Sequence, residues 1–286
     1  MSDLPARPDL EQLLRQVLDS RDPERLAELL AEEPSLAVAR MEHWCDHPKG
    51  APPLGYVAMM RYDTVHGLWR DVPGTGSLAR TLLEAGAPVN GEPGEPETPL
   101  ITAASYGDAE VARVLIEAGA DLEATAAPDA GGVPGGTALL HAAVFGMTDV
   151  LDVLVAAGAR VRSIEEAAAA GDLTGWIRSD TPLQARIRAL VMAADHQRLQ
   201  AIDELLAAST PIDAADAEWG RQALRVAAQN GRVASVRHLL AGGADPNVRD
   251  AEHGRTALDW CRHERRGSNA VAAHAEIEAM LAPVTS

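Results

Sequence analysis

The segment 43–47 holds the densest group of side chains in the sequence that could do chemistry. It reads His43-Trp44-Cys45-Asp46-His47, and three further candidates, Asp63, His66 and Asp71, follow in the segment 61–76. Imidazole and carboxylate groups act as general acids and bases, so an enzyme would use His43, His47, Asp63, His66 and Asp71. The imidazoles and the Cys45 thiolate are also zinc ligands, but their spacing matches no standard zinc motif. We therefore expect neither a metal nor a cofactor.

The sequence contains no standard catalytic or phosphate-binding motif. The glycine-rich stretch 131–136 has no lysine before the hydroxyl residue Thr137, so it is interpreted as an extended loop, and no G-x-S-x-G sequence occurs. His141 lies on a predicted helix, where we expect a packed, hydrogen-bonded core histidine rather than a catalytic one. Cys45 and Cys261 are the only cysteines, and we expect both to be free thiols.

Composition limits the classes of partner and the kind of core. The 42 acidic and 25 basic residues give a formal net charge of −17, which disfavours nucleic acids and anionic membranes as partners. The sequence begins without an apolar signal segment and has no apolar run long enough to span a bilayer, so we expect a cytoplasmic location. A hydrophobic share of 47% with only 3% aromatic residues predicts thin helical layers built from Ala, Leu and Val.

A recurring phrase organises most of the chain. Thr98-Pro-Leu-Ile-Thr-Ala-Ala104 is followed by Gly107 and then by Gly119-Ala-Asp121, and a similar order returns from Thr137 and from Ala223. In each copy a small Ala-Ala pair predicts a first helix that packs closely against its neighbours, and the following glycine ends that helix. A second helix follows with apolar residues at helical spacing. Because such a unit cannot bury its own apolar faces, the copies must stack.

These phrases resemble the ankyrin repeat family, whose repeat of about 33 residues is a β-turn followed by two antiparallel helices and is marked by T-P-L-H-x-A. The resemblance is to a bacterial-type ankyrin repeat protein with degenerate repeats and a long insertion, 61–76, in the first repeat. It implies an all-α fold, an α-solenoid of about eight stacked helix-turn-helix repeats with β-turn fingers. We expect a single array, 1–286, that begins with an N-terminal helical cap, 9–34, and ends with a C-terminal cap repeat, 251–282. The repeats between the caps are 48–91, 94–124, 133–161, the truncated 162–186, 187–213 and 218–248.

The resemblance also implies where binding residues lie, because in this family the β-turn tips and the end of each first helix line a concave surface. The N-terminal half of that surface is predicted to be apolar and aromatic, and the C-terminal half polar. The binding candidates are Trp44, Met59, Met60, Tyr62, Trp69, Tyr106 and Phe145. Aromatic and methionine side chains on such a face are typical of an interface anchor or a ligand pocket. For Tyr56, Leu68 and Trp69 the alternative is a satellite core beneath the insertion.

Two functions from different classes follow. The leading prediction is a protein-interaction module that binds a protein partner through the concave groove and finger loops. It depends on the resemblance and on the lack of a catalytic motif. The alternative is an enzyme or small-molecule binder whose apolar pocket is formed by the N-terminal half of the groove and the insertion 61–76. A long insertion beside an apolar groove keeps this alternative open.

Overall fold

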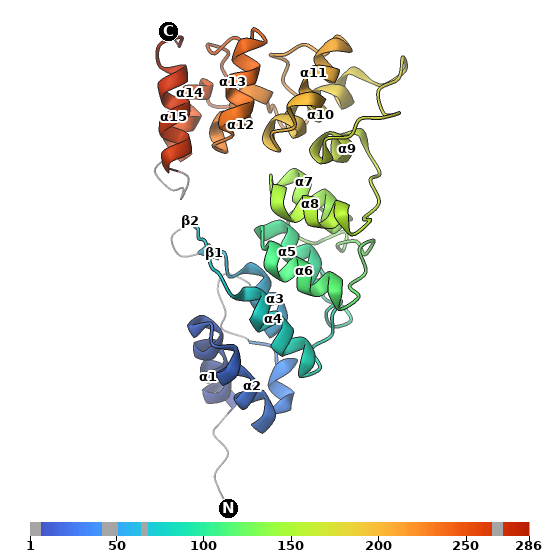
Figure 1. Cartoon of the computed structure of the whole chain (residues 1–286), viewed down its shortest axis with the longest axis vertical. Coiled ribbons are helices and arrows are strands. Elements are labelled where there is room, and N and C mark those ends of the chain that lie inside the picture. Colours follow the sequence, from blue (N-terminus) through green and yellow to red (C-terminus); the bar gives the residue numbers. More distant parts are fainter. Residues whose placement is uncertain (1–6, 42–50, 64–67, 265–270, 286) are drawn as a thin grey trace, which may run out of the picture. The chain divides into compact units, whose positions relative to one another are not determined.

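The computed structural model describes residues 7–41, 51–63, 68–264 and 271–285 (Figure 1). In these ranges the chain forms fifteen α-helices, and the paired short helices agree with the predicted α-solenoid class. The helices are α1 (Arg7–Ser20), α2 (Pro23–Glu32), α3 (Pro53–Met59), α4 (Thr75–Glu84), α5 (Pro99–Tyr106), α6 (Ala109–Glu117), α7 (Ala138–Val144), α8 (Thr148–Ala156), α9 (Ile164–Ala170), α10 (Leu183–Asp195), α11 (Leu199–Ala207), α12 (Ala223–Gln229), α13 (Val233–Ala241), α14 (Ala257–Glu264) and α15 (Val271–Leu281). A 3-10 helix, η1 (Pro34–Ala37), and two strands, β1 (Tyr62–Asp63) and β2 (Leu68–Trp69), complete the described elements.

The first helix of a pair, which we call the inner helix, is well shown by α5. Thr98 caps it by accepting a hydrogen bond from the Ile101 backbone N–H at 3.3 Å, and Pro99 occupies the first turn. The Ala103-Ala104 pair is fully buried, which lets neighbouring helices approach closely. Gly107 ends the helix in the left-handed conformation with φ +71°, where a side chain would be strained.

The second helix, which we call the outer helix, buries one apolar face. In α6, Asp108 caps the helix by accepting a hydrogen bond from the Val111 backbone N–H at 3.0 Å. Val111 and Leu115 are fully buried, whereas Glu117 is exposed. The recurring phrase thus folds into two helices whose apolar sides need a neighbour.

Inner helices pack on inner helices, and outer helices pack on outer helices. Among the inner helices, α3 packs on α5, α10 packs on α9 and α12, and α12 packs on α14. Among the outer helices, α4 packs on α6, α11 on α13, and α13 on α15. This is the nearest-neighbour stacking that a repeat without its own closed core requires.

The segment 162–186 departs from the paired arrangement. Its inner helix, α9, begins with a capping box in which Ser163 and Glu166 each accept a hydrogen bond from the other's backbone N–H. Residues 172–182 then run in turns, and α10 begins at Leu183, ahead of the predicted repeat 187–213. Within this fully described segment the predicted truncated repeat therefore has an inner helix and lacks an outer one.

Part of the insertion 61–76 is a small antiparallel hairpin. Strands β1 and β2 pair with Tyr62 opposite Trp69. The outer helix α4 begins at Thr75, so the predicted insertion ends inside its first turn. Residues 64–67, between the two strands in the sequence, lie outside the described residues.

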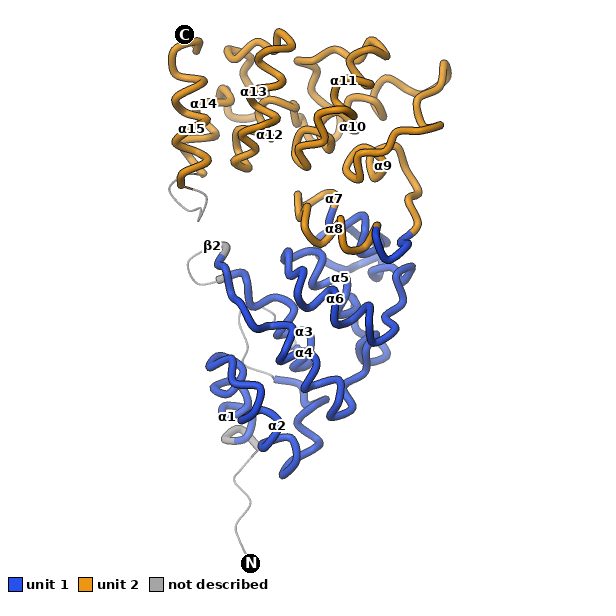
Figure 2. Tube along the Cα trace, viewed as in Figure 1, with its two compact units in different colours: residues 1–142, 156–159 blue, residues 143–155, 160–286 orange. Residues whose placement is uncertain are grey.

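The chain divides into two compact units by its internal contacts (Figure 2). Unit 1 comprises residues 1–142 and 156–159, and unit 2 comprises residues 143–155 and 160–286. Each unit has its own buried core, and Ala, Leu and Val dominate both, as the composition predicts.

Candidate functional site

The cluster 43–47 lies outside the described residues. The predicted residues His43, Trp44 and His47 belong to it, and His66 also lies outside. Asp63 and Trp69 are described only as strand residues. Asp71 is exposed, and its carboxylate lies 3.4 Å from a guanidinium nitrogen of Arg61. The acid–base site of the alternative function therefore stays a prediction.

Two of the predicted binding residues are in contact in unit 1. The rings of Tyr62 and Tyr106 lie with their centroids 5.9 Å apart and are tilted by 42°. Both side chains are half-buried, and so are Met59 and Met60 at the end of α3. Tyr56, by contrast, is only 6% exposed and belongs to the core of α3.

His141 is a packed core histidine, which confirms its predicted role. Its side chain is fully buried, its Nε2 donates to the Val133 carbonyl at 3.0 Å, and its Nδ1 lies 2.8 Å from the Ser105 hydroxyl. Burial lowers the pKa of His141, and the hydrogen bond to Val133 opposes this only in part. The imidazole is therefore neutral at neutral pH.

Neither a metal site nor a membrane span is found in the part of the chain that the structure describes. Its His, Cys, Asp and Glu side chains form no group of three or more that could hold a metal ion. None of its helices is both long enough and apolar enough to cross a membrane. Cys261 is a buried free thiol, as predicted, whereas Cys45 lies outside the described residues.

A pocket of about 680 Å³ lies in unit 2. Its wall is made by two finger loops, 216–221 and 250–255, by the inner helix α12, and by the residues at the ends of α7 and α10. Phe145, one of the predicted binding residues, lines this pocket and is 38% exposed. Val144 comes from the same predicted half of the groove as Phe145, and the other residues of the wall come from the half that was predicted to be polar.

The first finger, 216–221, closes around the carboxylate of Asp216. Its Oδ1 accepts a hydrogen bond from the Trp219 backbone N–H at 2.7 Å, and its Oδ2 accepts one from the Arg221 backbone N–H at 2.7 Å. Gly220 supplies the left-handed φ of +61° that this tight loop needs. The loop leaves the Trp219 side chain 44% exposed at the pocket.

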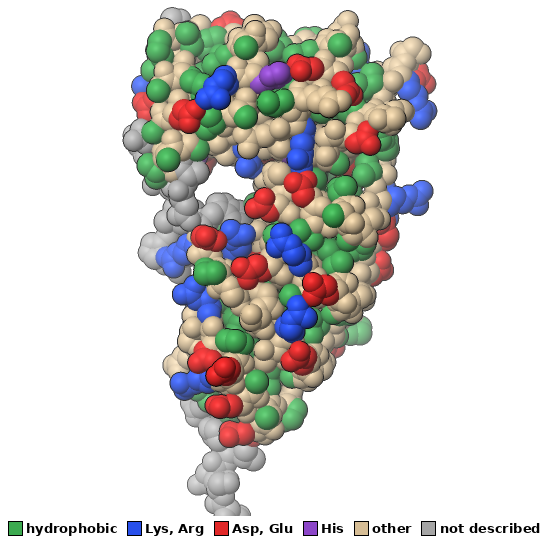
Figure 3. Space-filling model, in the orientation of Figure 1, with side chains coloured by type: hydrophobic (Ala, Val, Ile, Leu, Met, Phe, Trp, Pro, Cys, Tyr) green, Lys and Arg blue, Asp and Glu red, His purple; other side chains and the backbone are tan. Residues whose placement is uncertain are grey.

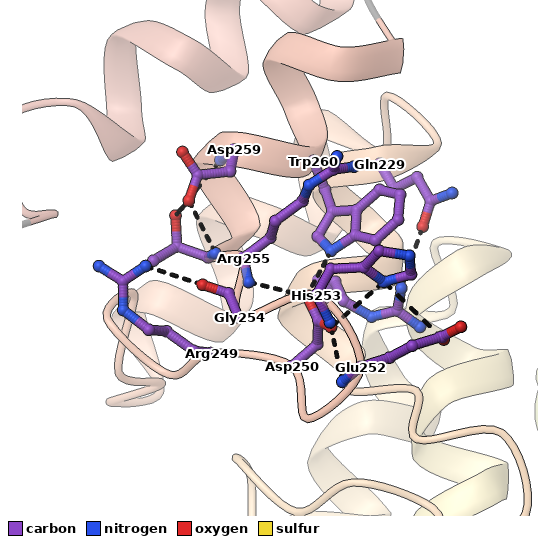
Figure 4. A network of polar contacts seen from close by, with 11 residues as sticks. Gln229, Arg249, Asp250, Glu252, His253, Gly254, Arg255, Asp259 and Trp260 are labelled. Atoms are coloured by element: carbon purple, nitrogen blue, oxygen red, sulfur yellow. Dashed lines mark hydrogen bonds and ion pairs between the residues drawn. The ribbon is translucent and has the colours of Figure 1, made fainter.

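The second finger, 250–255, repeats this loop around Asp250 (Figure 4). The Asp250 Oδ1 accepts from the His253 backbone N–H at 2.6 Å, and Oδ2 accepts from the Arg255 backbone N–H at 3.0 Å and the Trp260 indole N–H at 2.9 Å. Burial raises the pKa of this carboxyl, but these donors and the charge of His253 outweigh burial and lower the pKa to about 2. Asp250 is therefore a fixed negative charge whose oxygens are already hydrogen-bonded.

Arginine side chains stack on the tryptophans of both fingers. The guanidinium carbon of Arg221 lies 5.1 Å from the ring centroid of Trp219, and that of Arg225 lies 5.3 Å from the centroid of Trp260. Arg255 lies over Trp260 as well, at 4.9 Å. Stacking holds the plane of a guanidinium in place while its N–H edge stays able to donate to another group.

A buried ion pair completes the polar side of the pocket. Asp195 is 3% exposed, and its Oδ1 accepts hydrogen bonds from Arg232 Nε at 3.0 Å and from Asn230 Nδ2 at 2.9 Å. Arg232 also donates to the Gly146 carbonyl at 2.6 Å. The charge of Asp195 is thus compensated within the protein.

One face of the molecule carries both signs of charge. On the face shown in Figure 3, acidic and basic side chains lie interspersed with hydrophobic ones. The net charge of −17 is therefore not gathered into one acidic patch on that face.

The sequence does hold a signal for this pocket. Residues 216–221 read Asp-Ala-Glu-Trp-Gly-Arg, and residues 250–255 read Asp-Ala-Glu-His-Gly-Arg. The two fingers are thus copies of one another, differing only in the aromatic residue at the tip. The recurring helix sequences alone do not reveal the duplicated fingers, because each finger precedes its helices in the chain.

Comparison with known proteins identifies the family. Among solved structures, the human ASB11 ankyrin repeat domain is similar, with 22% sequence identity, a TM-score of 0.43, and coverage of 93% of this chain and 97% of that chain. No curated protein matches the sequence. A family model described as ankyrin repeats (3 copies) matches residues 73–165 and 190–272, and the chain therefore belongs to the ankyrin repeat family.

Proposed function

We propose that this chain binds a protein partner through the concave surface made by its finger loops and inner helices. Ankyrin repeats are in general protein–protein interaction modules. The observation that carries the proposal is the pair of exposed aromatic side chains at the pocket of unit 2, where Trp219 is 44% and Phe145 is 38% exposed. Aromatic side chains that meet solvent beside a pocket are typical of the residues that dominate a binding interface.

In unit 1 the proposed surface includes the contacting rings of Tyr62 and Tyr106, with Met59 and Met60 nearby in the sequence. Methionine adapts its shape to different partners, and tyrosine combines a large apolar ring with a polar hydroxyl. Trp44 and Trp69 remain predicted members of this surface.

The direct test places a photo-crosslinking amino acid, p-benzoylphenylalanine, at position 219 of the full chain in cells. We expect light to trap a protein at position 219. The matched control carries the same group at Leu183, which is also 44% exposed but does not line the pocket. A protein trapped equally well from both positions would contradict binding at the pocket.

A loss-of-binding test should follow with the trapped protein as ligand. Trp219→Ala combined with Phe145→Ala removes both exposed aromatics, and we expect capture of that protein to be lost with helical circular dichroism unchanged. The control is Leu183→Ala with Val155→Ala, whose residues are 44% and 38% exposed and so match the pair in exposure. Capture that survives the aromatic double variant would show that this face is not the binding site. Tyr62→Ala with Tyr106→Ala tests the surface of unit 1 in the same way.

A further inference from the structure

We infer that the pocket of unit 2 binds a carboxylate of a peptide segment in the partner protein, held by Arg221 and Arg225, with an apolar side chain of the same segment against Trp219. The inference rests on the proposed function and names the chemistry that the partner must present. It assigns a role to two charged residues that fold stability does not explain.

Neither of the two guanidinium groups has an ion pair within the described residues. Within the described part of the chain, the Arg221 guanidinium makes no hydrogen bond or ion pair, and it lies over the Trp219 ring. Arg225 makes one long hydrogen bond, 3.5 Å, to the Gln229 side chain, and its Nε is buried without a partner. Unpaired guanidinium groups that line a concave site are suited to bind carboxylates through two parallel hydrogen bonds.

Burial of the Arg225 guanidinium also favours a hydrogen-bonding partner for its charge. Burial lowers the pKa of its guanidinium, and the nearby charge of Arg221 lowers it further, whereas Asp250, Asp216 and Glu252 act in the opposite direction. Two like charges beside each other repel, so a carboxylate that contacts both would relieve this repulsion. Stacking on tryptophan holds both groups in place before binding, which reduces the entropy lost when the ligand docks.

Two of the four acidic residues that line the pocket already have other partners. Asp250 accepts hydrogen bonds from its own finger and from Trp260, and Asp195 pairs with Arg232. The two remaining acids, Glu218 and Glu252, are exposed at the pocket. They repel a strongly acidic segment, so the preferred ligand carries a single carboxylate among neutral or basic residues.

The apolar contact comes from the exposed aromatic rings. Trp219 and Phe145 line the same pocket as the two arginines, and Val144 adds an aliphatic side chain. A leucine or aromatic residue next to the carboxylate would cover these rings. The recognised feature is thus an apolar residue close to one carboxylate.

The test uses fluorescently labelled peptide pools and the full chain, with binding read by fluorescence anisotropy. All pools are nonapeptides with blocked ends. Each has a central Leu, one variable residue after it, and then Glu, Gln or Lys, which names the pool. The variable residue and all other positions are mixtures of Gly, Ser and Ala. We expect the Glu pool to bind about tenfold more tightly than the Gln pool, which corresponds to about 1.4 kcal/mol. A further pool with a free C-terminal Leu and no acidic side chain shows whether a main-chain carboxylate serves as well.

Variants then assign the effect to the two arginines. Arg221→Gln with Arg225→Gln should reduce binding of the Glu pool to the level of the Gln pool, whereas Arg178→Gln, outside the pocket, should have no effect. Arg221→Lys keeps the charge but loses the two-pronged geometry, and we expect an intermediate affinity. Glu218→Gln with Glu252→Gln should strengthen binding of the Glu pool, because it removes the repulsion at the rim.

Three results would overturn the inference. They are equal binding of the Glu and Gln pools, preference for the Lys pool, and binding of no pool below about 1 mM. The proposed function fails separately: if the partner trapped at position 219 is captured normally by the Trp219→Ala, Phe145→Ala variant, the pocket is not the interface. If that capture is lost but the Glu pool binds no more tightly than the Gln pool, the pocket is still the interface, and only the inference of a bound carboxylate is wrong.

Discussion

The finger loops 216–221 and 250–255 share one backbone arrangement and use their fourth residue differently. In both, an aspartate accepts backbone N–H bonds from inside the loop, and a glycine follows with left-handed φ, +61° in one and +63° in the other. In the first finger, Trp219 is exposed at the pocket. In the second, the His253 side chain is also exposed, at 41%, but it does not line the pocket and meets the Trp260 ring edge-on, with the ring centroids 5.3 Å apart.

The difference originates in the inner helix that follows each finger. Trp260 of α14 donates its indole N–H to Asp250, whereas the corresponding residue of α12 is Val226, which is 4% exposed and has no side-chain donor. The second finger is thereby tied to its own helix. The first finger lacks this tie, and its aromatic tip is the residue that we propose contacts a partner. Under this proposal, one loop sequence serves binding in the first finger and stability in the second, and a single residue of the next helix makes the difference.

The largest effect expected from this comparison concerns the two aspartates. Asp250→Ala leaves four donors without an acceptor, and we expect the free energy of unfolding to fall by about 3 kcal/mol. Asp216→Ala leaves only backbone donors, and we expect about 2 kcal/mol. Urea unfolding followed by circular dichroism measures both, and equal losses would contradict a separate contribution of the Trp260 bond.

The next effect separates binding from stability at the two tips. Trp219→Ala should weaken binding of the trapped partner by about 2 kcal/mol, or about 30-fold, and leave the urea midpoint unchanged. His253→Ala should do the reverse, because it removes the contact with Trp260 but no residue proposed to touch the partner. The comparison would fail if His253→Ala weakened binding as strongly as Trp219→Ala.

A smaller effect should follow when the second finger is made to resemble the first. Trp260→Phe keeps an aromatic ring in α14 but removes the N–H that bonds Asp250 at 2.9 Å. We expect a loss of about 1 kcal/mol in urea unfolding, the usual contribution of one hydrogen bond. In the Trp260→Phe background, Asp250→Ala should then cost about as much as Asp216→Ala does. An undiminished cost would show that the indole N–H does not distinguish the fingers.

The smallest effect is a change of stability with pH that comes from protonation of Asp250 at acidic pH. Its pKa is lowered from 3.8 to about 2 in the folded state, so its stabilisation is fully present above pH 4 and is lost as the pH falls toward 2. The difference in unfolding free energy between the native chain and Asp250→Asn should therefore be constant from pH 7 to pH 5 and shrink below pH 4. A difference that is unchanged at pH 3 would contradict a lowered pKa.

Sequence reasoning predicted the repeating helices because their determinants are local. A cap at Thr98, a small pair at Ala103-Ala104 and a left-handed glycine at Gly107 each act within a few residues. His141 could be interpreted correctly for the same reason, since its place in the phrase puts it on a buried helix. The early start of α10 at Leu183 was missed, because no capping side chain marks it: Pro182 stands at the N-cap.

The pocket could not be predicted by the same reasoning. Its residues come from segments far apart in the chain, such as Phe145, Asp195 and Arg225, and only stacking brings them together. The stacking of Arg221 on Trp219 depends on side-chain conformation, which spacing in the sequence does not specify. The duplicated finger sequence predicts the loops but not the partner that each aromatic residue meets.

The truncated repeat at α9 shows which part of a repeat can be replaced. α9 packs on α10 although the outer helix is replaced by the turns of 172–182. Glu165 of α9 and Arg188 of α10 join the two inner helices through an ion pair at 2.8 Å. Arg198, at the start of the outer helix α11, also donates to the Ala169 carbonyl of α9 at 2.8 Å. The repeat thus keeps its contacts with the next one although it has no outer helix of its own. A chimera that grafts residues 172–182 in place of another outer helix would offer a way to insert foreign loops into the array without cutting its stack.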